Sequence, residues 1–160
     1  MVTELERARA AASAVEDPEL PPLTIADLGI LRDVRLVDGA IEVTITPTYS
    51  GCPAMPEIAL AVEIAVRGAG IETIRVRTSL TPAWTTDWLT ETARRKLINL
   101  GIAPPEPGQG SDALFGGKAA ICPRCHSANT ERISAFGSTA CKALHRCLAC
   151  REPFEEFKCH

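Results

Sequence analysis

Apolar and polar residues alternate in two adjoining runs of the first half of the chain. Residues 34–45 read "VRLVDGAIEVTI", and Asp38 and Gly39 join the two runs as a pair typical of the two-residue turn of a β-hairpin. Pairing across this turn sets apolar residues against apolar residues. The opposed pairs are Leu36 with Ile41 and Val34 with Val43. Because residues two apart point to the same side of a strand, we predict a hairpin with one core-facing side.

Apolar residues recur at helical spacing on both sides of this hairpin. Thr3 and Glu6 fit a capping box at the start of a short helix that ends before Pro18. After the hairpin, residues 57–70 predict a second helix, which glycines at its C-terminal end terminate. The predicted apolar faces are Leu5, Ala8, Ala12 and Val15 in the first helix, and Ile58, Val62 and Ala65 in the second.

A third strand and a third helix follow. Residues 72–80 alternate with Ile74, Val76 and Leu80 as the apolar positions, and joining the hairpin to this strand through a helix calls for a right-handed crossover. Residues 85–101 predict a helix that ends at a glycine. Its candidate N-caps are Thr85, Thr86 and Asp87, and its apolar face is Leu89, Ala93, Leu97 and Leu100. The pattern indicates an α+β protein that begins with a small α/β sandwich, in which a mixed three-stranded sheet carries helices on one face.

Composition changes toward the C-terminus. Prolines and glycines in residues 101–118 indicate a semi-flexible connector rather than a regular element. Residues 1–117 carry a net charge of -6 and residues 118–160 one of +3, and six of the seven cysteines lie in the last 39 residues. We therefore predict a first domain at 1–103, a linker at 104–117 and a second, smaller domain at 118–160.

Two C-x2-C knuckles stand out in this tail, "CPRC" at 122–125 and "CLAC" at 147–150. Together they supply the tetrahedral four-sulfur shell that zinc prefers, and the segments around them read as strands of a zinc ribbon. Such a small domain would take most of its folding free energy, of order 10 kcal/mol, from the metal. An iron-sulfur cluster is the alternative, since spacing alone does not separate the two metals. The predicted ligands are Cys122, Cys125, Cys147 and Cys150.

Three more side chains of the tail are candidate ligands. Cys159 and His160 place a thiol, an imidazole and a terminal carboxylate side by side, and Cys141 is a further thiol. The alternative is that Cys141 is buried and the histidines lie on the surface. Because the tail is only weakly basic and the rest of the chain is acidic, we expect no nucleic-acid binding.

The remaining cysteine, Cys52, lies in "TPTYSGCPA" between a predicted strand and a predicted helix. A helix N-terminus favours the thiolate, so we expect a pKa below the usual value of about 8.5. The alternative is a small buried apolar residue. The first domain contains no histidine, which excludes a Cys-His catalytic pair within it and favours binding of a soft metal. The carboxylates of Asp17, Glu19 and Asp27 are then either polar loop residues or partners of that thiol.

No apolar stretch approaches the roughly 18 residues of a membrane helix, and the N-terminal segment lacks a hydrophobic signal sequence. We therefore expect a cytoplasmic protein that does not associate with a membrane. In that reducing compartment the cysteines are metal ligands or free thiols rather than disulfides.

Several segments are collinear with a known family, among them "DPELPPLTIADLGILRDV", "TPTYSGCPA" and "FGSTACKALHRCLACREPFEEFKCH". From about Asp17 to His160 the chain resembles the PaaD family of bacterial phenylacetate degradation. Its first domain also resembles the SufT-type domain of iron-sulfur cluster assembly proteins. The acidic segment and the loop cysteine that recur in that domain match Asp17, Pro18, Glu19 and Cys52.

The resemblance implies a protein encoded with the subunits of the multicomponent phenylacetyl-CoA epoxidase, a di-iron oxygenase that an iron-sulfur flavoprotein reductase supplies with electrons. The first domain lacks Glu-x-x-His helices and a Gly-rich dinucleotide fingerprint, so we expect neither oxygenase nor reductase chemistry from this chain.

We predict an accessory protein that matures an iron-sulfur or iron centre of one of these components. Cys52 would be a transient ligand of iron or of an iron-sulfur cluster, assisted by Asp17 or Glu19, in a homodimer. A non-catalytic structural or regulatory subunit bound to the oxygenase is the alternative. A thiol enzyme acting on a thioester is less favoured, because a base is missing.

Overall fold

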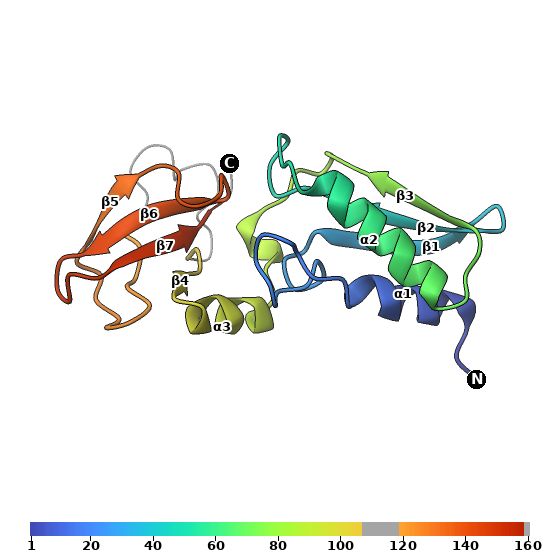
Figure 1. Cartoon of the computed structure of the whole chain (residues 1–160), viewed down its shortest axis with the longest axis horizontal. Helices are drawn as coiled ribbons and strands as arrows, with labels where there is room; N and C mark the ends of the chain where they lie inside the picture. Colours follow the sequence, from blue (N-terminus) through green and yellow to red (C-terminus); the bar gives the residue numbers. More distant parts are fainter. Residues whose placement is uncertain (107–118, 159–160) are drawn as a thin grey trace. The chain divides into compact units, whose positions relative to one another are not determined.

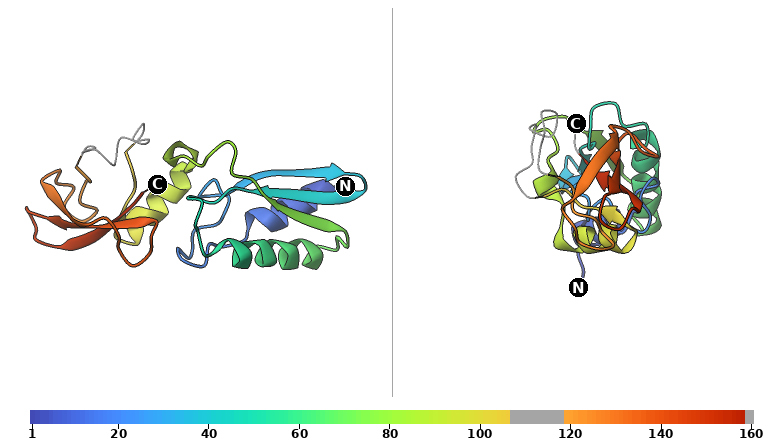
Figure 2. Two further views of the ribbon diagram at one scale, coloured as in Figure 1. Left: turned by 90° about the horizontal axis from the view of Figure 1, so that it is seen from above. Right: turned by 90° about the vertical axis from the view of Figure 1, so that its left-hand side faces the viewer.

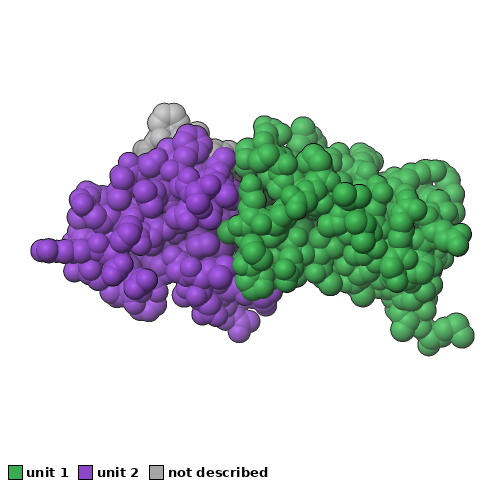
Figure 3. Space-filling model, in the orientation of Figure 1, with its two compact units in different colours: residues 1–84 green, residues 85–160 purple. Residues whose placement is uncertain are grey.

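The computed structural model describes residues 1–106 and 119–158. These residues form two compact units, residues 1–84 and residues 85–160 (Figure 3), and each is described by itself. Within the described ranges, no helix is both long enough and apolar enough to cross a membrane.

The first unit is built on a three-stranded mixed sheet (Figure 1). Strands β1 (Leu31–Val37) and β2 (Ala40–Ile45) pair antiparallel, and β2 pairs in parallel with β3 (Ile74–Thr78). The connection from β2 to β3 contains helix α2 (Met55–Gly68), and helix α1 (Glu4–Ser13) precedes the sheet. The predicted mixed three-stranded sheet is confirmed.

The hairpin has the predicted register. Leu36 lies opposite Ile41 and Val34 opposite Val43, across a turn in which Asp38 and Gly39 both have positive φ. Three of these four apolar side chains are buried, but Leu36 is 61% exposed. Leu36 lies on an edge strand beside the turn, whereas its partner Ile41 is on the central strand with a neighbour on each side.

Both helices of this unit pack on the same side of its sheet (Figure 2). The Thr3–Glu6 capping box starts α1 as predicted, and the helix buries Ala8 and Ala12. In α2 the residues that reach the core are Ile58, Val62 and Val66, so Val66 takes the place that the sequence pattern gave to Ala65.

The second unit begins with the 3-10 turn η1 (Thr86–Trp88) and helix α3 (Glu91–Asn99), and then forms a four-stranded sheet. Its strands, in the order β4-β7-β6-β5, are β4 (Ile102–Ala103), β7 (Pro153–Phe157), β6 (Lys142–Cys147) and β5 (Thr130–Ser134). β5, β6 and β7 are the three strands expected of a zinc ribbon, and β4 is an addition.

Two features of residues 85–103 differ from the sequence-based expectation. Thr90 caps α3, because the earlier candidate Thr85 caps the short η1 turn instead. Residues 85–103 also lie in the second compact unit, since β4 pairs in parallel with β7. Most of the predicted linker at 104–117 falls outside the described residues.

Candidate functional site

A loop between β2 and α2 presents Cys52. The loop leaves the sheet through the buried residues Thr46 and Thr48, and it turns where the Cys52 amide donates to the Tyr49 carbonyl at 3.2 Å. α2 then starts at Met55 with a proline in its first turn and no side-chain hydrogen bond at its N-cap, Ala54. Cys52 therefore stands just ahead of amides that have no acceptor within the helix, as the sequence predicted.

The electrostatic environment of Cys52 differs from the expectation of a lowered pKa. Burial of the partly buried thiol is the largest influence and raises its pKa, and the charges of Glu19 and Asp17 raise it further. The amides of Ala54 and Met55 act in the opposite direction but are outweighed. The helix N-terminus thus contributes as expected, but burial and two carboxylates keep the free thiol protonated at neutral pH.

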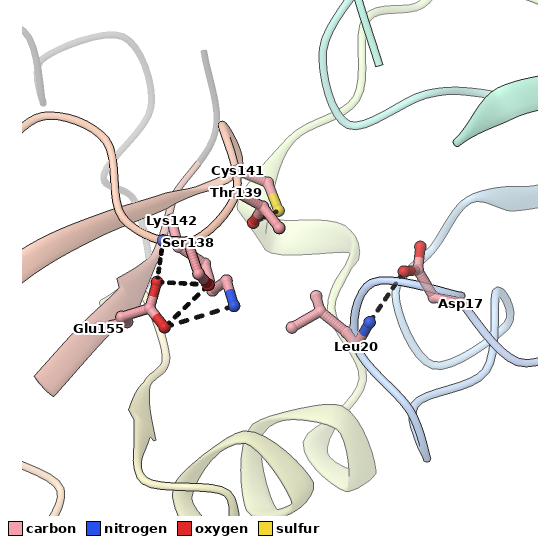
Figure 4. Close-up of polar contacts among 7 residues, drawn as sticks. All are labelled: Asp17, Leu20, Ser138, Thr139, Cys141, Lys142 and Glu155. Carbon is pink, nitrogen blue, oxygen red and sulfur yellow. Dashed lines mark hydrogen bonds and ion pairs between the residues drawn. The ribbon is translucent and has the colours of Figure 1, made fainter. Parts of the chain in front are cut away.

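Asp17 is held beside this loop by the backbone around it. Its carboxylate accepts hydrogen bonds from the amide of Leu20 at 3.1 Å (Figure 4) and from the amide of Glu19 at 2.8 Å, and the residue is only 6% exposed. Burial raises the pKa of Asp17, and the charges of Glu19 and Glu57 add to this effect. A buried carboxylate whose pKa is raised by burial and by like charges is typical of a functional position.

The thiol of Cys52 therefore lies near the acidic groups of Asp17 and Glu19, and Glu57 in turn acts on Asp17. The sequence indicated Asp17 and Glu19, but Glu57, in the first turn of α2, gave no separate signal. Asp27, also in the acidic segment, exchanges hydrogen bonds with Thr24 at 3.0 and 3.1 Å and so stabilises a turn. The sequence of this unit contains no histidine. A single thiol with oxygen ligands nearby is suited to transient binding of a metal.

The second unit gathers the four knuckle cysteines into one cluster. The sulfur atoms of Cys122, Cys125, Cys147 and Cys150 all lie within 4.8 Å of one another. Cys122 and Cys150 are 3.8 Å apart, and Cys125 and Cys147 are 3.5 Å apart. A tetrahedral zinc with bonds of about 2.3 Å separates its sulfurs by about 3.8 Å, so the cluster fits this ion. Within residues 1–106 and 119–158, no other group of three or more ligands is gathered closely enough for a metal ion.

The protonation of these thiols also suits a cation. The amide of Cys150 is the main influence that lowers the pKa of Cys147, to about 6. The amide of Glu152 favours the Cys150 thiolate, but burial and the neighbouring sulfurs outweigh it and raise the pKa of Cys150 to about 12. Four sulfurs this close cannot all ionise without a cation among them, because their charges repel.

Of the other candidate ligands of the tail, the structure describes Cys141, which is not part of this cluster. Cys141 is buried, with its sulfur 3.0 Å from the Thr139 hydroxyl, in agreement with the alternative interpretation of that residue. Cys159 and His160 lie outside the described residues.

Beside Cys141, the sheet carries polar contacts that the sequence did not indicate. The Glu155 carboxylate accepts hydrogen bonds from the amide and the hydroxyl of Ser138, and Lys142 lies 3.5 Å from it (Figure 4).

Two family profiles match the chain, one for each part. Residues 5–77 match a family described as an iron-sulfur cluster assembly protein, and residues 106–158 match the PaaD zinc beta ribbon domain. A protein of Escherichia coli (strain K12), whose name describes it as one of the subunits of 1,2-phenylacetyl-CoA epoxidase, is 48% identical over 147 residues, which cover 92% of this chain and 88% of that protein.

Solved structures resemble the N-terminal part. A domain of unknown function, DUF59, from Bacillus anthracis is 27% identical, with a TM-score of 0.53, and covers 59% of this chain and 91% of its own. A conserved hypothetical protein of Thermotoga maritima is 28% identical, with a TM-score of 0.48 and coverages of 57% and 91%.

A mixed sheet with a cysteine-bearing loop, followed by a four-cysteine ribbon, defines a two-part protein in which an iron-sulfur assembly domain precedes a zinc ribbon. The identity to the Escherichia coli protein extends through both parts. The chain belongs to the PaaD family.

Proposed function

We propose that this protein is an accessory factor that matures an iron-sulfur or iron centre of a phenylacetyl-CoA epoxidase system. The name of the Escherichia coli relative supports the assignment to an epoxidase system. The match of residues 5–77 to an iron-sulfur cluster assembly family supports the maturation role. Its client is then the iron-sulfur reductase or an oxygenase subunit of that system.

The observation that carries this proposal is the contrast between the two thiol sites. The ribbon offers four gathered sulfurs to one ion, whereas Cys52 is a single, partly buried thiol with the carboxylates of Asp17 and Glu19 nearby. A closed four-sulfur site retains its ion, but a site with one thiolate exchanges ligands readily. The ribbon metal is therefore a structural zinc, and Cys52 is the ligand of the transferred iron or cluster.

Transfer at Cys52 is an exchange of ligands without oxidation or reduction. The thiol releases its proton to solvent when the metal binds, and it takes a proton back when a client cysteine replaces it. Asp17 or Glu19 supplies a negative charge that favours the bound cation. The remaining ligands come from a small thiol or from Cys52 of a second copy, so we expect a homodimer when a cluster is bound.

The direct test is the cluster content of the client. The reductase is co-expressed with the wild-type chain, with Cys52→Ser, or with Ser50→Ala, an exposed residue of the same loop that serves as control. Iron, acid-labile sulfide and visible absorption are then measured per reductase after anaerobic purification. Cys52→Ser should leave the reductase deficient in cluster while Ser50→Ala does not, and full loading with Cys52→Ser would remove the carrier role.

The second candidate is a structural or regulatory subunit that stays bound to the oxygenase, and the relative's name as an epoxidase subunit favours it. In that case the chain would co-purify with the oxygenase in fixed stoichiometry. Epoxidase activity would then survive Cys52→Ser but not Cys125→Ser, which opens a zinc knuckle.

A further inference from the structure

The sheet of the first unit has one face that its helices leave open. α1 and α2 lie on the same side of the strands (Figure 2), and along β2 the buried residues alternate with the partly buried Glu42 and Thr44. On the open side, the register sets Arg35, Glu42 and Arg75 in one row across the three strands. The neighbouring row consists of Asp33 on β1, Thr44 on β2 and Arg77 on β3.

Three guanidinium groups share this face with two carboxylates, those of Glu42 and Asp33, and Arg35 lies within 4.0 Å of both. Arg35 donates to Glu42 through Nε at 3.1 Å and Nη2 at 2.5 Å. This hydrogen bonding chiefly, with the charges of Arg35, Arg77 and Arg75, lowers the pKa of Glu42. Arg75 and Arg77 are exposed, and neither forms an ion pair within 4.0 Å in the described part of the chain. Both carboxylates of the face pair with Arg35, so Arg75 and Arg77 are left without an ion-pair partner there and the three arginines exceed the two acidic groups by one charge.

This charge opposes that of the unit that bears it. Residues 1–84 contain twelve acidic residues and seven arginines, a net charge of -5, and no lysine. A sheet face needs only polar side chains to be soluble, so solvation alone does not account for three arginines in adjacent positions. Arginine is the cation whose planar fork bonds a carboxylate through two parallel N–H groups.

We propose that this open sheet face, defined by Arg35, Arg75 and Arg77, docks the client protein through an acidic helix. Arg75 and Arg77 project from the same side of β3 at a separation of about 7 Å, close to that of carboxylates at positions i and i+4 of a helix. A helix on this face would form the missing second layer of the sheet. The negative charge of the unit disfavours nucleic acid, which carries dense negative charge of its own.

The position of the arginines fits the proposed function. The inference rests on that function, because it takes a component of the epoxidase system as the partner. β2 and β3 run parallel, so Arg77, near the end of β3, lies at the end of the sheet from which the Cys52 loop leaves β2. A client bound on this face is therefore held at the end of the sheet that presents the transferring thiol.

The test is the binding of purified reductase and purified oxygenase to the full-length protein at low and high salt. Arg75→Glu with Arg77→Glu is compared with Arg67→Glu with Arg95→Glu, a control pair of exposed arginines elsewhere. The first pair should slow association with one component about tenfold at low ionic strength, with a smaller difference in about 0.5 M salt, while the control stays near wild type. Arg75→Gln with Arg77→Gln should show the same effect more weakly, which separates it from misfolding.

Several results would overturn this inference. Binding of neither component, or unchanged association after reversal of Arg75 and Arg77, would remove the docking role whatever Cys52→Ser does to the client's cluster. Wild-type binding to a short DNA duplex that the reversal abolishes would assign the face to nucleic acid. A dimer that becomes monomeric on reversal would assign it to a second copy of the chain. Conversely, the charge reversal could slow docking while the Cys52→Ser variant still loads its client normally. That result would refute the carrier role of Cys52 and leave the docking role intact.

Discussion

Nε2 of His145 on β6 lies 2.8 Å from Oε2 of Glu156 on β7, and both side chains are more than nine-tenths buried. The contact is a close electrostatic approach rather than an aligned hydrogen bond, since neither ring nitrogen has a hydrogen-bond partner in the described structure. Phe154 stacks on the imidazole with 5.5 Å between ring centroids. The ribbon sheet thus contains a polar pair in its interior, and one member lies on the strand that ends in the cluster cysteine Cys147.

Removing one member of this pair should destabilise the ribbon. Glu156→Ala leaves the buried imidazole without its neighbour, and we expect a loss of about 1–3 kcal/mol in unfolding free energy. Replacing both, as His145→Phe with Glu156→Leu, should recover most of this loss, because apolar side chains can substitute for a buried polar pair. Denaturant-induced zinc release, followed with a chromophoric chelator, measures the stability of the single and the double variant. Equal stability of Glu156→Ala and wild type would show that the pair contributes nothing.

Gly137 is constrained by a side chain rather than by its backbone. A Cβ at this position would overlap the carboxylate of Glu155, which accepts hydrogen bonds from Ser138. Gly137→Ala should therefore cost about 1 kcal/mol by displacing that carboxylate. The effect should nearly vanish in a Glu155→Ala background, since the displaced group is then absent. Thermal unfolding of the four proteins completes this cycle, and additive losses would contradict the explanation.

Local signals in the sequence determined much of the fold. The Asp38–Gly39 turn specified the hairpin and its register, and Thr3 with Glu6 specified the first helix start. The start of α3 was missed because Thr85 does cap a helical turn, but a 3-10 turn of only three residues. Propensity does not say how far a turn continues.

The candidate sites also include parts that local sequence predicts and parts that depend on tertiary packing. The four-cysteine cluster was predictable because spacing alone brings both sulfurs of a knuckle together. The surroundings of Cys52 were only partly predictable. Sequence placed the thiol at a helix N-terminus, but the opposing influence of burial depends on packing that no local motif encodes. The His145–Glu156 pair also depends on strand alignment between β6 and β7, so its two members gave no joint signal.

Asp17 should limit the stability of the first unit at neutral pH. Burial raises its pKa in the folded protein above the ordinary value of 3.8, so its contribution to stability is greatest in acid and is lost as the pH rises through the raised pKa. Asp17→Asn can still accept both amide hydrogen bonds, and we expect it to be more stable than wild type at pH 7 by on the order of 1 kcal/mol. The difference should shrink toward pH 4.

Asp17→Ala is the matched control for this effect. It removes the charge and also the hydrogen bonds from Glu19 and Leu20, so it should be less stable than Asp17→Asn by about 1–2 kcal/mol. Calorimetric unfolding between pH 4 and pH 8 gives the stability of wild type, Asp17→Asn and Asp17→Ala as a function of pH. An Asn variant that parallels wild type at every pH would mean that the buried charge carries no cost.

Zinc removal should unfold the ribbon without changing the Cys52 loop. The four-sulfur site supplies of order 10 kcal/mol in small zinc domains, so a chelator in excess should abolish the ribbon's structure. Cys125→Ser should release zinc at lower chelator concentration. Hydrogen exchange at the amides of β6 and β7 reports the loss, while α2 should keep its protection.

Alkylation of Cys52 by iodoacetamide should be slow at pH 7 and should speed up as the pH approaches the raised pKa, above the ordinary value of 9.0. The reacting species is the thiolate, and burial with the charges of Glu19 and Asp17 disfavours it. Glu19→Gln removes one of those charges, so the rate at pH 7 should rise several-fold, whereas Glu63→Gln on the distant part of α2 should leave it unchanged. Peptide mapping by mass spectrometry separates Cys52 from the zinc-bound cysteines. A rate at pH 7 equal to that of an unfolded peptide would show that neither burial nor the carboxylates affect this thiol.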